Sequence, residues 1–481
     1  MRRATLLILG TALSACSMAP KYVRPEPPIP PSWPTGDAYL QQSEAALPAI
    51  SYGDIFRDPR LQRVVDQALT NNRDLRVALA NIASARAQYR IQRGELFPAI
   101  GATGAYSYSH SNTPSSTAPS GTSESFSAGI GVTGFEIDLF GRIRSLTTAA
   151  QNRYFAQEAT ARATRLTLVG DVAGAWLSYA ADRSLLAIAE QTVANAQRSV
   201  SLTDARLKGG IAPRTDLRQA EQILAGAEAD VAAQKTALAQ DINALQLLVG
   251  APVDPALLPA SIEEAAPTIG DLPAGLDSRI LLRRPDVVSA EYTLRAANAQ
   301  IGAARAQLFP TLSLTSFAGF ASGALRNLFT SGAFNYSASP GVRYSIFNAG
   351  AAQAGVAQSE AQRDAALAGY EKAILTAFRE VSDALARRGT IGDQLAADQR
   401  NNDAALDNYQ LSDARYRGGI DTFLASLIAQ RSLYSAQRTL VQTRLSRATN
   451  LVTLYRTLGG DSLIEADAGG PAPVAQQNPQ Q

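Results

Sequence analysis

A duplication within the chain constrains its fold more than any other feature of the sequence. The segment Leu202–Ile211 recurs as Leu411–Ile420, and seven of the ten positions are identical. A second pair of matching segments, Arg93–Pro98 and Arg305–Pro310, ends in Leu-Phe-Pro both times. In each pair the two matching segments are about 210 residues apart, which is too long a period for a solenoid. We therefore expect two similar halves that lie side by side and share one order of elements.

The helices predicted in each half differ in length. Each half begins with a helix of about 22 residues, at 73–95 and 285–307, which ends at Leu-Phe-Pro because proline stops a helix. Later in each half comes a tract without proline, at 142–208 and 351–417, which as one helix would extend about 100 Å. A Gly-Gly pair ends each tract, and a return helix of about 35 residues follows. Apolar residues repeated every seven positions predict coiled-coil packing.

Two strands are predicted between the short helix and the long tract of each half. In the clearest one, 335–346, large apolar residues alternate with small or polar ones, and Gly134 shifts the phase of another. This alternation is typical of a membrane β-barrel strand with a wet interior, and a soluble sandwich is the alternative. Four strands cannot close a barrel, and open sheet edges are not tolerated in lipid. Three chains would pool twelve strands, whereas two would pool eight, too few for an open channel.

The N-terminus has the features of an export signal. Arg2 and Arg3 precede a short apolar stretch, 6–13, that is too short to span a bilayer. The stretch runs into Leu13–Cys16, which resembles a bacterial lipobox, so we expect an acylated Cys16 to begin the mature chain. A plain signal peptide with an incidental cysteine is the alternative. Ser17, rather than an aspartate, follows the cysteine, which resembles the sorting rule for outer-membrane lipoproteins.

Proline-rich residues 20–34 cannot form a helix and predict an extended tether. The expected domains follow from these features. They are a signal peptide at 1–15, a lipidated N-terminal tether at 16–58, a first repeat at 59–262, a second repeat at 263–460 and a disordered tail at 461–481.

The composition argues against an enzyme. The chain has one histidine and one cysteine, which excludes a His/Cys metal site and a Cys–His catalytic pair. Its formal charge of +2 does not favour a nucleic-acid partner. Glu136 and Asp138 lie on one side of a predicted strand, where we interpret them as lumen-lining residues rather than an acid/base pair. We expect no catalytic residue, no metal and no cofactor, with Trp33 and Trp176 as packing residues and His110 as a solvated loop residue.

The whole mature chain resembles the TolC/OprM-type outer-membrane efflux proteins, and within them the NodT-like lipoprotein branch. Several motifs carry the resemblance through their order and spacing. They are the lipobox with Tyr22–Pro25, Phe56–Leu61, Ala68–Leu75, the two Leu-Phe-Pro stops, Phe135–Gly141, Arg283–Val287 and the two Gly-Gly turns.

The resemblance implies a mainly α fold with a membrane β segment. It implies a homotrimer whose twelve-stranded outer-membrane β-barrel, four strands per chain, continues into a long periplasmic α-helical barrel. It also implies docking to a periplasmic adaptor protein and to an inner-membrane pump of the RND type or another type. The pump would supply the energy, because this chain has no nucleotide-binding loop.

The Gly-Gly turns are the candidate functional tips. In the family, acidic side chains near the second turn surround the closed periplasmic end, and Asp413 and Asp421 lie there in this chain. Like charges crowded by threefold symmetry can bind cations or gate a pore. The alternative for Asp413 is a solvated helix residue paired with Arg417. The candidate adaptor-docking residues are Arg206, Lys208, Gly209, Gly210, Arg415, Arg417, Gly418 and Gly419.

One departure from the family bears on the constriction. Where related chains often carry an aspartate, this chain has Ile428, so an apolar constriction is an alternative. Two other functions also fit parts of the pattern. A type I secretion channel shares the fold and differs in cargo, and a periplasmic coiled-coil scaffold shares the heptads but needs no alternating strands.

Overall fold

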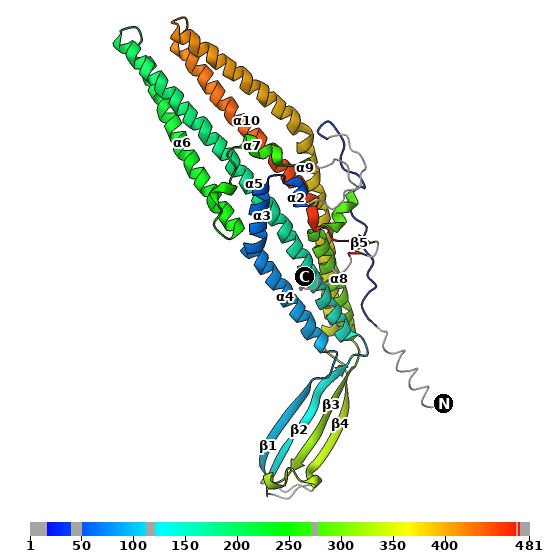
Figure 1. Cartoon of the computed structure of the whole chain (residues 1–481). Coiled ribbons are helices and arrows are strands. Elements are labelled where there is room, and N and C mark those ends of the chain that lie inside the picture. Colours follow the sequence, from blue (N-terminus) through cyan, green and yellow to red (C-terminus); the bar gives the residue numbers. More distant parts are fainter. Residues whose placement is uncertain (1–16, 40–50, 112–120, 272–277, 468–469, 472–481) are drawn as a thin grey trace. The chain divides into compact units, whose positions relative to one another are not determined.

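The computed structural model describes residues 17–39, 51–111, 121–271, 278–467 and 470–471. Cys16, the export signal and most of the predicted tail therefore lie outside the described residues. The chain divides into two compact units, and Figure 1 draws the helices and strands that make them up. Unit 1 contains residues 1–24, 81–157 and 290–370, and unit 2 contains residues 25–80, 158–289 and 371–481.

Unit 1 holds a four-stranded antiparallel sheet in the order β1-β2-β3-β4. The strands are β1 Ile100–Ser111, β2 Gly121–Ile137, β3 Thr311–Ser322 and β4 Phe334–Arg343. The predicted phase shift at Gly134 is confirmed, because the pairing of β2 with β3 slips between Val132 and Phe135. Strand β4 ends three residues before the predicted position 346, because its last partner, Thr311, is the first residue of β3.

The helices match their predicted lengths closely. The short helices are α4 Arg73–Gly94 and α8 Pro285–Ala306, each of 22 residues. The long tracts are α5 Arg142–Lys208 and α9 Ala351–Arg417, each of 67 residues. The return helices are α6 Arg214–Val249 and α10 Phe423–Thr457. Within the described residues, no helix is both long and apolar enough to cross a membrane.

Shorter elements complete unit 2 and the loops of the sheet. Asp58 caps α3 by accepting a hydrogen bond from the Arg60 amide, with Pro59 at the first helical position. Trp176 is fully buried and donates from its indole N–H to the Leu257 carbonyl, 2.9 Å away, which confirms its packing role. The shorter elements are α2 Tyr52–Ile55, α3 Pro59–Asn71, η2 Pro255–Leu257, α7 Ile262–Ala265, η3 Ala266–Thr268, η4 Ser278–Arg283, η5 Leu325–Asn327, η6 Ser331–Ala333, η7 Gly460–Ser462, β5 Ala466–Asp467 and β6 Gly470–Pro471.

The proline-rich tether is extended, as predicted, but its side chains pack against the protein. In unit 2, Trp33 is buried and stacks on Phe378 with 5.1 Å between ring centroids. The carbonyl oxygens of Pro30 and Pro31 accept hydrogen bonds from the side chain and the amide of Ser278. The backbone of an extended segment cannot bond to itself, so these partners hold it.

The prediction of a disordered tail from residue 461 is wrong for its first residues. Asp461 accepts hydrogen bonds from Arg165, at 2.7 Å, and from Tyr455, at 3.2 Å. Ile464 is buried, and its amide bonds to the Arg283 carbonyl. Because the tail is mostly polar, its sequence did not indicate that Asp461 and Ile464 hold its first residues in place.

Candidate functional site at the helical turns

The two Gly-Gly turns have the same backbone geometry. Gly210 and Gly419 have φ angles of +74° and +75°, a left-handed conformation that glycine adopts without strain. In each turn, an isoleucine amide bonds back to an arginine carbonyl: Ile211 to Arg206 at 3.0 Å and Ile420 to Arg415 at 2.9 Å. These bonds satisfy carbonyls at the helix ends, so the duplicated sequence produces two equal hairpin turns.

The two turns of one chain contact each other through an apolar cluster. Tyr416, Phe423, Leu427 and Ala220 are buried in it, and Val200, Leu202 and Ile223 pack against it. The ring centroids of Tyr416 and Phe423 are 5.3 Å apart. The residues of the cluster come from α5 and α6 of the first hairpin and from α9 and α10 of the second, so apolar burial joins the ends of both hairpins.

Arg206 adds a polar contact to this cluster. Its guanidinium lies over the Tyr416 ring, 4.4 Å from the centroid. It also donates to the carbonyl oxygens of Tyr416 and Arg417, at 3.0 and 3.1 Å. These carbonyls end α9, where a cation interacts favourably with the helix dipole. The side chain from the first turn therefore caps the helix that leads into the second.

Both candidate gate carboxylates form ion pairs within the chain. Asp413 pairs with Arg417 at 2.7 Å, which is the contact that the alternative interpretation of Asp413 expected. Asp421 pairs with Arg415 at 2.6 Å, and the hydrogen bond from that guanidinium lowers the pKa of Asp421. Lys208 pairs with Asp204 at 2.7 Å. The gate role of the two aspartates remains a proposal.

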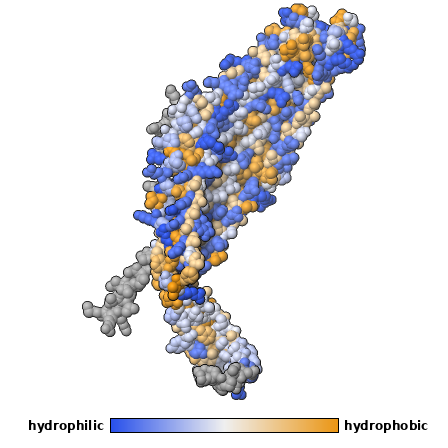
Figure 2. Space-filling model, turned by 180° about the vertical axis from the view of Figure 1, so that it is seen from behind, coloured by the Kyte–Doolittle hydropathy of each residue, from blue (hydrophilic) through white to orange (hydrophobic). Residues whose placement is uncertain are grey.

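Apolar side chains are exposed around the same turns. Several large ones are more than half exposed, among them Ile211, Ile420, Leu424 and Ile428. Figure 2 shows hydrophobic residues gathered at the upper end of the helical part, among hydrophilic ones. Solvated apolar side chains grouped at one end of a molecule are typical of a surface that another protein covers.

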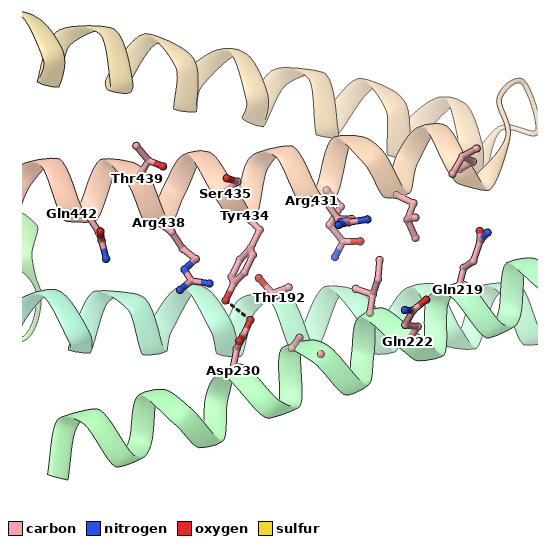
Figure 3. A pocket seen from close by; sticks show the side chains of 16 residues that line it. Thr192, Gln219, Gln222, Asp230, Arg431, Tyr434, Ser435, Arg438, Thr439 and Gln442 are labelled. Atoms are coloured by element: carbon pink, nitrogen blue, oxygen red, sulfur yellow. Dashed lines mark hydrogen bonds between the residues drawn. The ribbon is translucent and has the colours of Figure 1, made fainter. Parts of the chain in front are cut away.

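A groove runs between α6 and α10, beyond the turns (Figure 3). Its volume is about 870 Å³. Tyr434 on α10 crosses it and donates its hydroxyl to Asp230 on α6, at 2.7 Å, while the Arg438 guanidinium lies 5.4 Å from the Tyr434 ring. Burial, and then the hydrogen bond to Asp230, raise the pKa of Tyr434 to about 12.

This polar link between the halves was not predicted from the sequence. The duplication could not reveal it, because the other half has Ala225, Ala229 and Thr439 at the corresponding positions. Only the packing of α6 against α10 brings Asp230 to Tyr434.

A buried carboxylate that was not predicted from the sequence holds the N-terminal segment in unit 1. Glu291 on α8 is fully buried and accepts hydrogen bonds from Tyr22, Arg24 and Arg295, at 3.1, 2.8 and 3.1 Å. Burial of a carboxylate is tolerated when cations and hydroxyls satisfy it. The same segment passes Gly302, where an added Cβ would lie 2.6 Å from the Ala19 nitrogen.

The predicted lumen-lining carboxylates are ion-paired where β2 leads into α5. Glu136 accepts two hydrogen bonds from Arg142, and Asp138 accepts from the backbone and side chain of Arg144. His110 is exposed, with a ring nitrogen 3.3 Å from the Thr122 hydroxyl. Within the described part of the chain, no group of three or more His, Cys, Asp or Glu residues could hold a metal ion.

Comparisons with known proteins agree on one family. The family model for outer membrane efflux proteins matches residues 64–251 and 276–460. The chain is 43% identical over 461 residues to a probable efflux pump outer membrane protein, TtgC, of Pseudomonas putida, covering 95% of both chains. It is 38% identical to the outer membrane protein OprJ of Pseudomonas aeruginosa, covering 94% of this chain and 95% of the relative.

Solved structures show the same similarity. The open state of the MtrE outer membrane channel of Neisseria gonorrhoeae matches with a TM-score of 0.83 and 32% identity, over 93% of this chain and 99% of that one. A structure of CusC, described in terms of transmembrane channel formation, matches with a TM-score of 0.82 and 35% identity, over 92% of this chain and all of that one.

Proposed function

Because the chain belongs to the outer membrane efflux protein family, we propose that three copies form a passive exit duct across the outer membrane. The observation that carries this proposal is the sheet of unit 1. Strands β1 and β4 each have one paired neighbour, so both edges of the sheet are open. Lipid does not tolerate open edges, and copies that join their edges would remove them. Three copies would close twelve strands into a barrel wide enough for a channel.

The exposed side chains of the sheet support a membrane location. Strand β4 is exposed along its whole length, and Tyr336 and Val342 keep 81% and 71% of their surface. On β1, Ile100 and Tyr106 are also more than half exposed. Large apolar and aromatic residues that alternate with small polar ones are typical of barrel strands in the outer membrane.

The cargo we propose is a small organic compound rather than a protein. Relatives of this chain are named as outer membrane proteins of antibiotic, toluene and solvent efflux pumps. These names favour efflux over type I secretion. We propose no catalytic residue and no cofactor, because the relatives are named as pump components and the duct needs neither.

The energy and the selection of cargo would come from partners. We propose that a periplasmic adaptor protein docks at the helical turns and connects the duct to an inner-membrane transporter. The apolar side chains exposed around the turns support this site, as do the arginines beside them. Asp413 and Asp421 would then face the axis of the closed end, where three copies of each concentrate negative charge.

The N-terminal anchor is part of the same proposal. An acylated Cys16 would hold the chain at the periplasmic leaflet while the strands assemble. Mass spectrometry of the purified protein tests this, since we expect a mature chain that begins at Cys16 and carries acyl chains. A free amino terminus downstream of Cys16 would contradict it.

Two measurements test the duct itself. Native mass spectrometry in mild detergent should report a trimer, and a stable monomer would contradict the pooled barrel. Expression with its adaptor and pump in a drug-sensitive Gram-negative host should restore resistance, and planar bilayers should show discrete channels. Restored export of a secreted toxin, with no change in drug resistance, would favour the type I secretion channel instead.

A further inference from the structure

The second half of the chain carries an arginine where the first half continues a row of apolar residues. Positions of the long and return helices that differ by 209 in number are equivalent, because α5 and α9, the glycine pairs and the starts of α6 and α10 all keep that offset. Arg447 on α10 is thus equivalent to Leu238 on α6, which is buried. Leu440 and Leu454 lie seven positions to either side of Arg447. A charged residue weakens the packing of such a row, so Arg447 is a candidate for a role other than packing.

Arg447 lies where two adjoining clefts of unit 2 meet. Their volumes are about 570 and 420 Å³, and α9, α10 and residues 262–271 supply most of their walls. Small-molecule sites in proteins have volumes of roughly 300–1,000 Å³, so each cleft is large enough for an organic ligand. The residues that line both clefts are Asp271, Leu395, Arg444, Arg447 and Leu451.

The two clefts carry an excess of positive charge. Arg388 also lines the first cleft, and Arg57 and Glu263 also line the second. Four arginines therefore face two carboxylates, which leaves a net charge of +2. The first half of the chain has no such cluster on its helices, because the residues equivalent to Arg388, Arg444 and Arg447 are Tyr179, Lys235 and Leu238.

The two carboxylates do not compensate this charge evenly. Glu263 pairs with Arg444 at 2.5 Å. Asp271 is mostly exposed and approaches Arg388 only to 3.8 Å, which is longer than a hydrogen bond. Burial lowers the pKa of Arg388, although the charge of Asp271 opposes this effect. The surroundings of Arg388 therefore compensate its positive charge incompletely.

Two of the arginines keep their donors for another molecule. Arg57 and Arg447 are exposed, and within residues 51–111, 121–271 and 278–467 no hydrogen bond or ion pair of either side chain is recorded. A guanidinium presents five N–H donors in a planar fork that matches a carboxylate, a sulfonate or a phosphate. Apolar side chains lie beside these donors, because Leu395 is half-buried and Leu451 is buried in the walls of both clefts.

We propose that the clefts bind a small organic anion with an apolar body. Arg388 and Arg447 hold its carboxylate, sulfonate or phosphate group, and Leu395 and Leu451 contact its apolar part. All the residues that line the clefts belong to unit 2 of one chain. The site therefore goes beyond the proposed exit duct and does not require three copies.

Calorimetric titration with naphthalenesulfonate tests the class of ligand. The full chain in nanodiscs of zwitterionic lipid should bind it saturably, at one site per chain, and more weakly as salt increases. Naphthol has the apolar body without the charge, and inorganic sulfate has the charge without the body. Each should bind at least about tenfold more weakly, the effect of losing about 1.4 kcal/mol. No saturable binding of naphthalenesulfonate, or equal binding of sulfate, would overturn the proposal.

Replacing Arg447 by the residue of the first half tests the charge. Arg447→Leu restores the apolar row and should weaken binding at least about tenfold, because a hydrogen bond between charged groups contributes about 1.5–3 kcal/mol. Arg431→Leu is the matched control, since it removes one exposed arginine from the same helix outside both clefts. Equal affinity in the two variants would overturn the role of Arg447 and the site with it.

A substitution that keeps every arginine tests the location. Gly392 on α9 lines the first cleft, and an added Cβ there would meet no atom within 4 Å. Gly392→Leu should therefore fill the cleft without disturbing the fold and should prevent binding. Gly369→Leu, at an exposed and equally open position of α9, should bind as the wild type does. Unchanged binding in Gly392→Leu would overturn the location.

Two further measurements separate this site from an anionic lipid and from the duct. A phospholipid headgroup has the same chemistry, so the titration is repeated in nanodiscs that contain phosphatidylglycerol. Unchanged affinity supports a soluble anion, whereas a tenfold loss would assign the clefts to lipid and overturn the proposal. Native mass spectrometry reports the trimer separately: a monomer that still binds naphthalenesulfonate would contradict the duct and support the site.

Discussion

The short helices α4 and α8 have the same length and end at the same tripeptide, yet within the described residues of one chain α8 is covered and α4 is not. Helix α4 has no buried residue, whereas α8 buries Glu291 completely. Positions in these helices correspond at an offset of 212, so Glu291 is equivalent to Leu79, which is more than half exposed. The N-terminal segment packs against α8, and no segment in the described chain packs against the equivalent face of α4. The comparison teaches that duplication copies the scaffold while single substitutions give each half its own partner.

Replacing Glu291 should have the largest effect on stability, because it removes the group that binds the N-terminal segment to α8. Glu291→Ala would leave Arg24 and Arg295, which are only partly exposed, without the buried carboxylate that pairs with both, at a cost of about 3–5 kcal/mol. The N-terminal segment should detach from α8 and become sensitive to protease, and the thermal midpoint should fall. Leu79→Ala, at the equivalent exposed position, is the control and should change stability by no more than about 0.5 kcal/mol. Equal protease resistance in both variants would refute the role of Glu291.

Replacing Gly302 should have the next largest effect on stability. A Cβ there would lie 2.6 Å from the Ala19 nitrogen and 2.7 Å from the Ser145 hydroxyl, so Gly302→Ala should displace the segment at a cost of about 1–3 kcal/mol. Gly94→Ala on α4 is the control, because no atom lies within 4 Å of its added Cβ. Hydrogen exchange of residues 17–24 reports the displacement, and unchanged exchange in Gly302→Ala would show that the close approach is relieved elsewhere.

A third difference between the halves involves two neighbouring carboxyl groups in unit 2, those of Asp182 and Asp241. Burial, and then the charge of Asp182, raise the pKa of Asp241 to about 7. The second half has Ile391 and Asn450 at the equivalent positions. A raised carboxyl pKa means that the folded state binds the extra proton, so stability should fall as pH rises from about 4 to about 7 and then level off.

Asp241→Asn should remove this pH dependence, because it copies the second half. Above pH 7 it should raise stability by only about 1 kcal/mol, since both groups are partly solvated and water screens their repulsion. Thermal midpoints between pH 5 and pH 8 provide the measurement. A wild-type midpoint that rises with pH across this range would have the wrong sign for the proposed pair.

The smallest expected effect concerns the link across the groove. Tyr434→Phe removes the hydrogen bond to Asp230 and keeps the ring, so it should cost about 0.5–1 kcal/mol. Its equivalent in the first half is Ala225, so no second link of this kind replaces it. Hydrogen exchange along α6 and α10 should increase near the groove. Thr439→Val, at the position equivalent to Asp230, should leave the exchange unchanged, and similar exchange in both variants would count against the link.

The helices and strands could be predicted from the sequence because local chemistry decides them. Proline in each Leu-Phe-Pro, the Gly-Gly pairs and the alternation of strand residues act within a few positions of the chain. The predicted helix at 142–208 therefore agrees with α5, and the phase shift at Gly134 with the slipped register. The length of each tract needs no knowledge of what packs against it.

The contacts of the candidate site depended on the tertiary structure. Nothing near Arg206 in the sequence indicates that it reaches the end of α9, more than 200 positions away, while its equivalent Arg415 remains exposed. The partners of the N-terminal tether could not be predicted from its own residues, because Arg24 and Pro30 bond to Glu291 and Ser278, which are distant in the sequence. By itself, the sequence determined the order and approximate bounds of the long helices and the strands, because proline, glycine pairs and residue alternation act locally. Only the tertiary structure decided which equivalent residues are buried, because burial and ion pairing depend on segments that are distant in the chain and close in space.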